Sequence, residues 1–272
     1  MTGLLAQVNT VFDWLLRPFR FARPIYPLAL LSLLTTLLAL LVFRYGSNQR
    51  AIRRAKDRLE AHVLEVRLFQ DQLRVVLRAY ARLLGGVLVY LRHSLPPLAL
   101  LALPLLIILV QLEAYFGHTP LQTGNNFIVK ARVAGNTSLD EVSLRLPDGL
   151  KLTSPPLRIA EQREIDWRVQ ADQAGQYAVD VLVGREAFTK QVTVGEGLTR
   201  VLPERARTSV VEEFLHPGEA QLPAAGPLES IEVLYRPRSL RLAGYDLHWL
   251  VPFLTITLLG AFALKGIFRT EI

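Results

Sequence analysis

The chain has 272 residues, of which 51% are hydrophobic, and carries a formal net charge of +7. The sequence contains no cysteine, which excludes disulfides, thiolate metal sites and cysteine nucleophiles. Its apolar residues are concentrated in three blocks, 25–43, 95–112 and 247–264, each close to the roughly 20 residues that a helix needs to cross a bilayer. The composition therefore predicts an integral membrane protein.

Residues 1–23 form the first predicted element, an amphipathic helix. Its apolar residues recur at helical spacing: Leu4, Leu5, Val8, Val11, Phe12, Leu15, Leu16 and Phe19. This helix is expected to lie along the membrane interface, with Trp14 and Phe19 as anchors, or equally to pack on the protein's own spans. The first predicted span, 25–43, follows it and is expected to be retained as a helix.

Residues 44–94 contain eleven Lys or Arg and four Asp or Glu, a surplus that equals the net charge of the whole chain. Such a loop between two spans is typical of the cytoplasmic side, and nucleic-acid binding is not expected because no recognition motif accompanies the charge. The segment is predicted to form a long helix or coiled coil, continuous or folded back at Gly85 and Gly86. Its candidate headgroup-facing residues are Arg50, Arg53, Arg54 and Arg58, and its candidate partner-binding stripe is Leu59, Val63, Val66, Leu73 and Leu77.

The second predicted span, 95–112, is followed at 120–195 by a change from helical periodicity to alternation. Strand-like runs separated by turn signals predict an antiparallel β-sandwich there. Asp172, Gly175 and Tyr177 form the pattern D-x-x-G-x-Y, typical of the corner in immunoglobulin-like domains where a tyrosine hydroxyl bonds to the backbone. The sequence therefore predicts an immunoglobulin-like all-β domain at 120–195.

Residues 196–246 are rich in proline and glycine and are interpreted as a linker with one further strand-like stretch, 231–235. The third predicted span is 247–268. The charge bias places 44–94 and the C-terminus in the cytoplasm, and the N-terminus and the β domain outside it. The predicted fold class is thus a membrane α-helical protein of three spans with an extracytoplasmic β-sandwich, located as a multi-pass protein in a cell membrane such as a bacterial inner membrane.

No reaction centre is evident in the sequence. The five histidines have no metal-ligand spacing, and the phosphate-binding, dinucleotide-binding and serine-nucleophile motifs are all lacking. The sequence predicts a protein that is not an enzyme, with no catalytic, cofactor-binding or metal-binding residues. The expected partners are the lipid bilayer and other membrane proteins, either client chains or fixed subunits of a complex.

The layout of the first 115 or so residues resembles that of the YidC/Oxa/Get superfamily of membrane-protein insertases, especially its small three-span members. The resemblance is carried by the run FRYGSNQ at 43–49, which leads into Ile52, Lys56 and Leu59, by the span 95–112, and by a closing helix from Trp249. It implies a role in membrane-protein insertion or assembly. The inserted β domain and the lack of a charged groove residue depart from the family. The alternatives are an accessory subunit that docks through its β domain and cytoplasmic helix, and third, a sensor.

Overall fold

The computed structural model describes residues 2–46, 54, 57, 61, 73–135, 137–207, 218–242 and 244–268. The chain divides into two compact units, one made of Met1–Leu28 with Ile108–Trp249, and the other of Ala29–Ile107 with Leu250–Ile272. The first unit holds the N-terminal helix and the β domain. The second holds most of the long apolar helices.

Three helices in the described part of the chain are long and apolar enough to cross a membrane. Their apolar stretches are Ile25–Gly46, Leu95–Gly117 and Leu250–Phe268. The first is helix α2 (Ile25–Gly46), the second belongs to α4 (Leu73–Leu112) with the π-helix η2 (Glu113–Gly117) that follows it, and the third is α6 (Leu250–Phe268). This confirms the three apolar helices predicted from composition, although the third begins a few residues later than expected.

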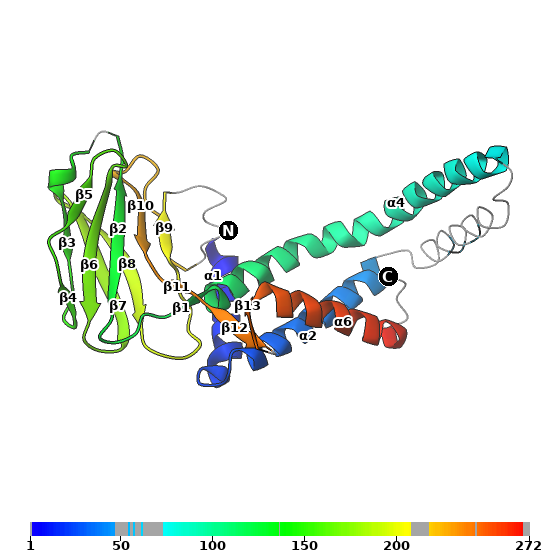
Figure 1. The fold of residues 1–272 in the computed structure, drawn as a ribbon, viewed down its shortest axis with the longest axis horizontal. Helices are drawn as coiled ribbons and strands as arrows, with labels where there is room; N and C mark the ends of the chain where they lie inside the picture. The colour runs from blue at the N-terminus through cyan, green and yellow to red at the C-terminus, as the bar shows by residue number, and fades with distance from the viewer. Residues whose placement is uncertain are drawn as a thin grey trace. The chain divides into compact units, whose positions relative to one another are not determined.

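Helix α4 is a single helix of 40 residues that is drawn without a break in Figure 1. It runs through Gly85 and Gly86, so the alternative in which the chain folds back at these two glycines is wrong. It also contains Pro96, Pro97 and Pro104. Apolar residues therefore continue along one helix from the predicted basic segment into the predicted second span.

Hydroxyl groups join α2 to α6 within the second unit. Thr36 is fully buried, and its hydroxyl donates to the carbonyl of Ser32 at 2.9 Å and to that of Thr257 at 3.1 Å. A Cβ atom at Gly260 would come within 3.0 Å of the same hydroxyl, so the glycine allows the two helices to approach. These contacts are typical of small and hydroxyl-bearing residues at interfaces between membrane helices.

The β domain consists of two antiparallel sheets (Figure 1). The larger has the order β4-β6-β2-β10-β9 with β5 beside β6, and the smaller has the order β3-β7-β8. The larger sheet contains β2 (Asn126–Val133), β4 (Leu150–Leu152), β5 (Leu157–Ile159), β6 (Glu164–Ala171), β9 (Glu204–Ala206) and β10 (Leu228–Val233). The smaller contains β3 (Val142–Arg145), β7 (Gly175–Val183) and β8 (Glu186–Val194).

One core lies between the two sheets because alternate residues of each strand point inward. Val129 of β2, Trp167 of β6, Val181 of β7 and Val192 of β8 all belong to this buried cluster. The alternation predicted from sequence thus appears as antiparallel sheets that enclose a hydrophobic core.

Residues 196–246 do not form a plain linker, and the further strand expected at 231–235 overlaps β10. Their described part supplies β9 and β10 to the larger sheet, β11 (Arg236–Pro237) beside β1 (His118–Thr119), and the pair β12 (Ser239–Leu242) and β13 (Tyr245–His248). Leu222, Leu228 and Ile231 from this region are fully buried in the sandwich core. The prolines and glycines that suggested a linker lie mainly between these short strands, and the burial of the intervening apolar residues holds the segment against the domain.

Candidate functional site

Side chains from three distant segments of the first unit meet at one polar junction. It comprises Asn9 and Asp13 of α1 (Thr2–Leu16), Gln111 and Tyr115 at the end of the second apolar stretch, and Arg200 from the loop after β8. Gln111 is fully buried, donates to Asn9 at 2.7 Å and accepts from Arg200 at 2.9 Å. The hydroxyl of Tyr115 donates to the carboxylate of Asp13. The junction thus fixes the N-terminal helix to the end of the second stretch and to the β domain.

Arg200 is the charged centre of this junction. Its guanidinium lies 3.8 Å from the Asp13 carboxylate and 5.3 Å from the ring centroid of Tyr115, within the range of a cation–π contact. Burial lowers the pKa of Arg200, and the nearby charge of Asp13 opposes this shift. Because arginine remains charged in proteins, the junction holds a partly buried positive charge.

The loop that carries Arg200 is held against the turn after α1. The Leu198 amide donates to the Arg20 carbonyl at 2.9 Å. Gly197 has a φ of +94°, and a Cβ atom there would lie 2.4 Å from the Arg20 carbonyl oxygen. The buried Arg238 side chain donates to the carbonyls of Gly197 and His118. Only glycine suits this position, because it must combine a left-handed conformation with a close backbone approach.

The residues around η2 connect the second apolar stretch to the chain that enters α6. The indole of Trp249 donates to the Glu113 carboxylate at 2.9 Å, and His118 lies 3.8 Å from the same carboxylate. Burial lowers the pKa of His118, with Glu113 opposing and His248 adding to the shift. Glu113 therefore lies between the exit of one apolar stretch and the entry of the next.

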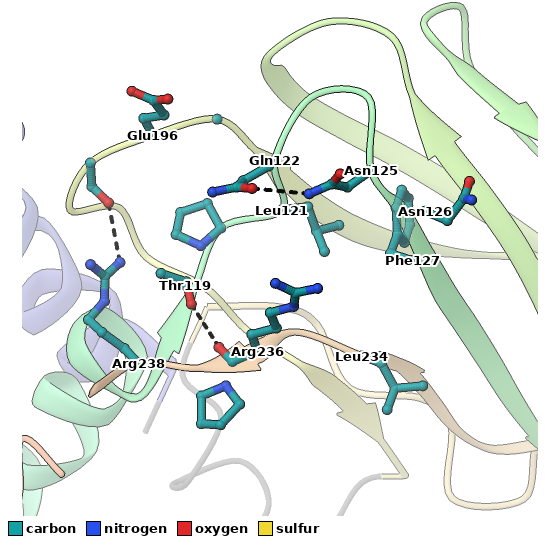
Figure 2. Close-up of a pocket in the computed structure, with 14 residues that line it drawn as sticks. Thr119, Leu121, Gln122, Asn125, Asn126, Phe127, Glu196, Leu234, Arg236 and Arg238 are labelled. Carbon is teal, nitrogen blue, oxygen red and sulfur yellow. Dashed lines mark hydrogen bonds between the residues drawn. The ribbon is translucent and has the colours of Figure 1, made fainter. Parts of the chain in front are cut away.

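A cavity of about 400 Å³ lies at the end of the sandwich near β1 and β11 (Figure 2). Figure 2 shows three hydrogen bonds at this cavity. Arg238 donates to the Gly197 carbonyl, the Thr119 hydroxyl donates to the Arg236 carbonyl, and Asn125 donates to Gln122. The lining contains amides, two arginines and a glutamate, but no nucleophile with an adjacent base. This cavity can present hydrogen-bond donors to a polar group, and its residues do not assemble a reaction centre.

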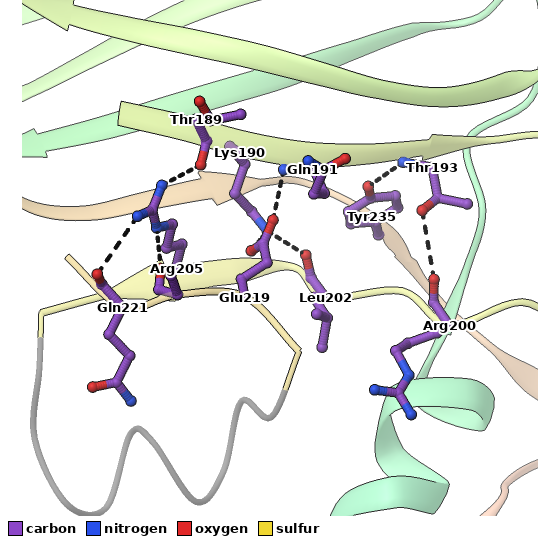
Figure 3. A network of polar contacts seen from close by, with 11 residues as sticks. Thr189, Lys190, Gln191, Thr193, Arg200, Leu202, Arg205, Glu219, Gln221 and Tyr235 are labelled. Atoms are coloured by element: carbon purple, nitrogen blue, oxygen red, sulfur yellow. Dashed lines mark hydrogen bonds and ion pairs between the residues drawn. The ribbon is translucent and has the colours of Figure 1, made fainter. Parts of the chain in front are cut away.

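A second polar network lies beside β8 (Figure 3). Lys190 is fully buried, and its ammonium group donates to the Leu202 carbonyl at 2.7 Å and to the Glu219 carboxylate. Glu219 also accepts from the Gln191 amide at 2.6 Å. Burial lowers the pKa of Lys190, and the charge of Glu219 opposes the shift. We call this pair the Lys190–Glu219 latch, because it holds the segment that precedes β10 against the smaller sheet.

Arg205 and Tyr235 extend this network on either side, as Figure 3 shows. The Arg205 guanidinium donates to the carbonyls of Thr189, Ala220 and Gln221. The Tyr235 hydroxyl accepts from the Thr193 amide at 3.0 Å, and burial raises the pKa of this hydroxyl above its ordinary range. These contacts satisfy buried backbone groups, which indicates a structural rather than a chemical use of the network.

The structure describes three of the nine partner-binding and headgroup residues predicted on the basic segment. Leu59, Val63 and Val66 lie outside the described residues, as do Arg50, Arg53 and Arg58. Leu73 and Leu77 lie in the first turns of α4, and Arg54 is helical and exposed. The predicted stripe and headgroup surface therefore stay predictions.

The three residues of the predicted corner lie where the chain passes from β6 to β7, with Asp172 in the turn and Gly175 and Tyr177 at the start of β7. The Tyr177 hydroxyl donates to the backbone carbonyl of Gln173 at 2.8 Å, and Asp172 pairs with Lys151 at 2.6 Å. Gly149 has a φ of +96°, and a Cβ there would come within 2.9 Å of the Tyr177 hydroxyl. The tyrosine thus packs on the backbone turn between β3 and β4 as well as donating to the backbone of its own corner.

Gln111, Arg200 and the Lys190–Glu219 latch were not singled out from the sequence. Gln111 was detectable as a polar residue in an apolar stretch. Lys190 was detectable as a charged residue at one of the alternating strand positions that are otherwise apolar. Within the described ranges, no group of three or more histidine and acidic side chains could hold a metal ion. No family model matches the chain, and the comparisons with curated proteins and with solved structures found no match.

Proposed function

We propose that this chain is a non-enzymatic, multi-pass membrane protein that assists the insertion or assembly of other membrane proteins. The proposal is carried by one observation, the exposed apolar stripe on α4. Leu84 and Leu88 are 66% and 68% exposed, and Leu91, Leu95 and Leu98 continue the stripe at spacings of three and four residues. Helical periodicity places these five residues on one face.

The stripe begins outside the second predicted span and continues into it. Leu84 and Leu91 lie before the stretch Leu95–Gly117, whereas Leu95 and Leu98 lie within it. Leu77 of the predicted partner-binding stripe stands one heptad before Leu84. An apolar client segment could therefore move along one helix from the cytoplasmic surface to the hydrocarbon without leaving an apolar face.

Membrane embedding is part of this proposal and is supported by the low burial of the three stretches. Only 11% of the α6 stretch is buried within the protein, and Leu254, Leu258, Leu259 and Phe262 are among its exposed side chains. Outward-facing apolar side chains are unfavourable in water, whereas in a lipid bilayer they contact hydrocarbon. The basic surplus of residues 44–94 supports placing them in the cytoplasm and the β domain outside it.

We also infer that the β domain is a variant of the immunoglobulin fold. The order β3-β7-β8 corresponds to strands C-F-G, and β4-β6-β2 corresponds to D-E-B. In place of strand A, the later strand β10 pairs with β2. Tyr177 stands near the start of β7, where the tyrosine of an immunoglobulin corner is expected.

Photocrosslinking from α4 tests the insertion role. Probes at Leu84 and Leu88 should capture several newly made membrane proteins while translation is running, and these adducts should disappear after translation stops. Gly86 is the matched control. It follows Leu84 by two residues, which corresponds to a rotation of about 200° around the helix, so a probe there points away from the stripe. Capture of one constant protein from Leu84 and Leu88, independent of translation, would reject this role.

The accessory-subunit alternative is favoured by a different observation, the polar junction. Gln111 and Arg200 tie the β domain to the end of an apolar stretch, as a domain that docks a fixed partner would require. In that case the constant crosslinked partner should also remain bound to the protein after purification in mild detergent. No described feature links the β domain to an output domain, so the sensor reading gains no support.

A further inference from the structure

A basic cavity lies between α1, the turn after it and the loop of residues 198–200. It measures about 520 Å³. Its walls contain three guanidinium groups, those of Arg17, Arg20 and Arg200, against one carboxylate, that of Asp13. Trp14, Tyr115, Thr10 and Thr199 also line it. The cavity is therefore suited to an anion that accepts several hydrogen bonds.

The single carboxylate of the cavity is already engaged. Asp13 accepts from the Tyr115 hydroxyl and lies 3.8 Å from Arg200. Arg17 and Arg20, in contrast, are exposed and form no ion pair with any residue that the structure describes. Two positive charges thus face the cavity without an ion-pair partner among the described residues.

An apolar hollow of about 440 Å³ adjoins this cavity. It is lined by Trp14, Leu15, Arg17, Pro18 and Phe19, so that Trp14 and Arg17 belong to both. Trp14 is 74% exposed, which leaves its ring open on the surface of α1. A polar, basic site beside an apolar one matches a ligand with a charged head and a hydrocarbon tail.

The place of the site in the chain also points to a lipid. Arg17 and Arg20 precede α2 by a few residues, and α2 begins at Ile25 with an apolar stretch of 22 residues. Residues immediately outside a span lie at the depth of the lipid headgroups. This step rests on the membrane embedding proposed above.

We propose that the cavity binds the phosphate of an anionic phospholipid on the side of the membrane that holds the β domain. Arg17 and Arg20 donate to the phosphate oxygens, a geometry for which the guanidinium fork is suited. Arg200 adds positive charge from the wall, and the hollow beside Trp14 receives the start of one acyl chain. The site is separate from the headgroup-facing arginines predicted at 50–58.

The experiment compares the full chain purified from bilayers of phosphatidylcholine with and without phosphatidylglycerol, with native mass spectrometry counting the retained lipids. The wild-type protein should retain phosphatidylglycerol in preference to phosphatidylcholine. Arg17→Gln combined with Arg20→Gln should weaken this retention about thirtyfold, since each arginine near an anionic surface contributes about fivefold. The matched control is Arg145→Gln with Arg185→Gln, two exposed arginines of the β domain, which should leave retention unchanged.

Two further measurements keep the outcomes separate. Trp14→Ala should reduce retention of phosphatidylglycerol while leaving any binding of inorganic phosphate in lipid-free detergent unchanged. If inorganic phosphate binds the wild-type protein but all variants retain lipid equally, the ligand of the cavity is a free anion. That result would overturn the lipid assignment. Equal retention by the wild type and the double variant without phosphate binding would overturn the site itself.

A separate measurement tests whether the chain is embedded in the membrane. Extraction of membranes with alkaline carbonate releases peripheral proteins and leaves embedded ones. A chain that stays embedded but shows no selective lipid loss in the double variant disproves only the lipid site. A chain released by carbonate disproves the embedding, and with it the premise of the site.

Discussion

Lys190 on β8 and Glu219 in the segment before β10 form an ion pair at the edge of the sandwich core. Lys190 occupies a core-facing position, between Phe188 and Val192, and is fully buried. Its pair with Glu219 joins the smaller sheet to the segment that leads into the larger one. The latch therefore contributes to closing one side of the sandwich.

Removing one partner of the latch should destabilise the β domain. Glu219→Gln leaves the buried ammonium group without its counter-charge, at an expected cost of about 3–5 kcal/mol. Adding Lys190→Met should recover much of that loss, because an apolar side chain of similar length replaces the buried charge. Hydrogen exchange of β8 in the full chain measures both effects, and a Glu219→Gln variant as stable as the wild type would contradict the latch.

His118 should make stability depend on pH. Burial lowers its pKa from 6.5 in the folded state, so the unfolded chain binds the proton more readily. The contribution of neutral His118 is fully present above about pH 6.5 and is lost as the pH falls toward the lower folded pKa. Denaturation of the full chain in detergent should therefore show a steeper decline below pH 6.5 for the wild type than for His118→Gln. Identical pH profiles would contradict the prediction.

Gly197→Ala should loosen the loop that carries Arg200. The substitution places a Cβ 2.4 Å from the Arg20 carbonyl oxygen and also imposes a left-handed conformation on alanine. Gly184→Ala is the control, because Gly184 also has a positive φ but no atom within 4 Å of the added Cβ. We expect about 1–2 kcal/mol for the control and at least about 1 kcal/mol more at Gly197. Exchange protection of the Leu198 amide reports the difference, and equal losses would argue against the close approach.

Tyr177→Phe removes the hydrogen bond to the Gln173 carbonyl and keeps the packing of the ring. The expected loss is about 1 kcal/mol, because the freed carbonyl lies near solvent and can bind water. A loss of up to about 3 kcal/mol would indicate that the carbonyl stays unsatisfied. Exchange of β7 amides in the full chain provides the measurement. No detectable change would mean that the hydroxyl does not stabilise the corner.

The proposed orientation can be tested because the chain lacks cysteine. Single cysteines at Ser47 and Ser154 place one probe in the basic segment and one in the β domain. With the outer barrier opened and the inner membrane intact, an impermeant thiol reagent should label position 154 and not position 47. The opposite labelling would reverse the topology.

The sequence alone determined the elements that depend on local periodicity. Three apolar stretches predicted the three long apolar helices, and alternation of apolar and polar residues predicted the strands between 126 and 194. These signals are strong because hydrophobic burial acts on every helical turn or every second strand residue. After residue 195 the same periodicity indicated only the stretch 231–235, which overlaps β10, because the other strands there have two to four residues and are too short to show a clear alternation.

Only the tertiary structure decided which polar residues matter. Gln111, Arg200 and Asp13 are far apart in the sequence, and their meeting depends on the chain path that brings α1, the end of α4 and the β8–β9 loop together. Likewise, the sequence shows that Lys190 occupies a strand position where an apolar residue is expected. It does not show the partner, Glu219, which lies 29 residues away. Long-range polar contacts leave no periodic pattern in a single sequence, because geometry and desolvation, rather than local spacing, select the partners.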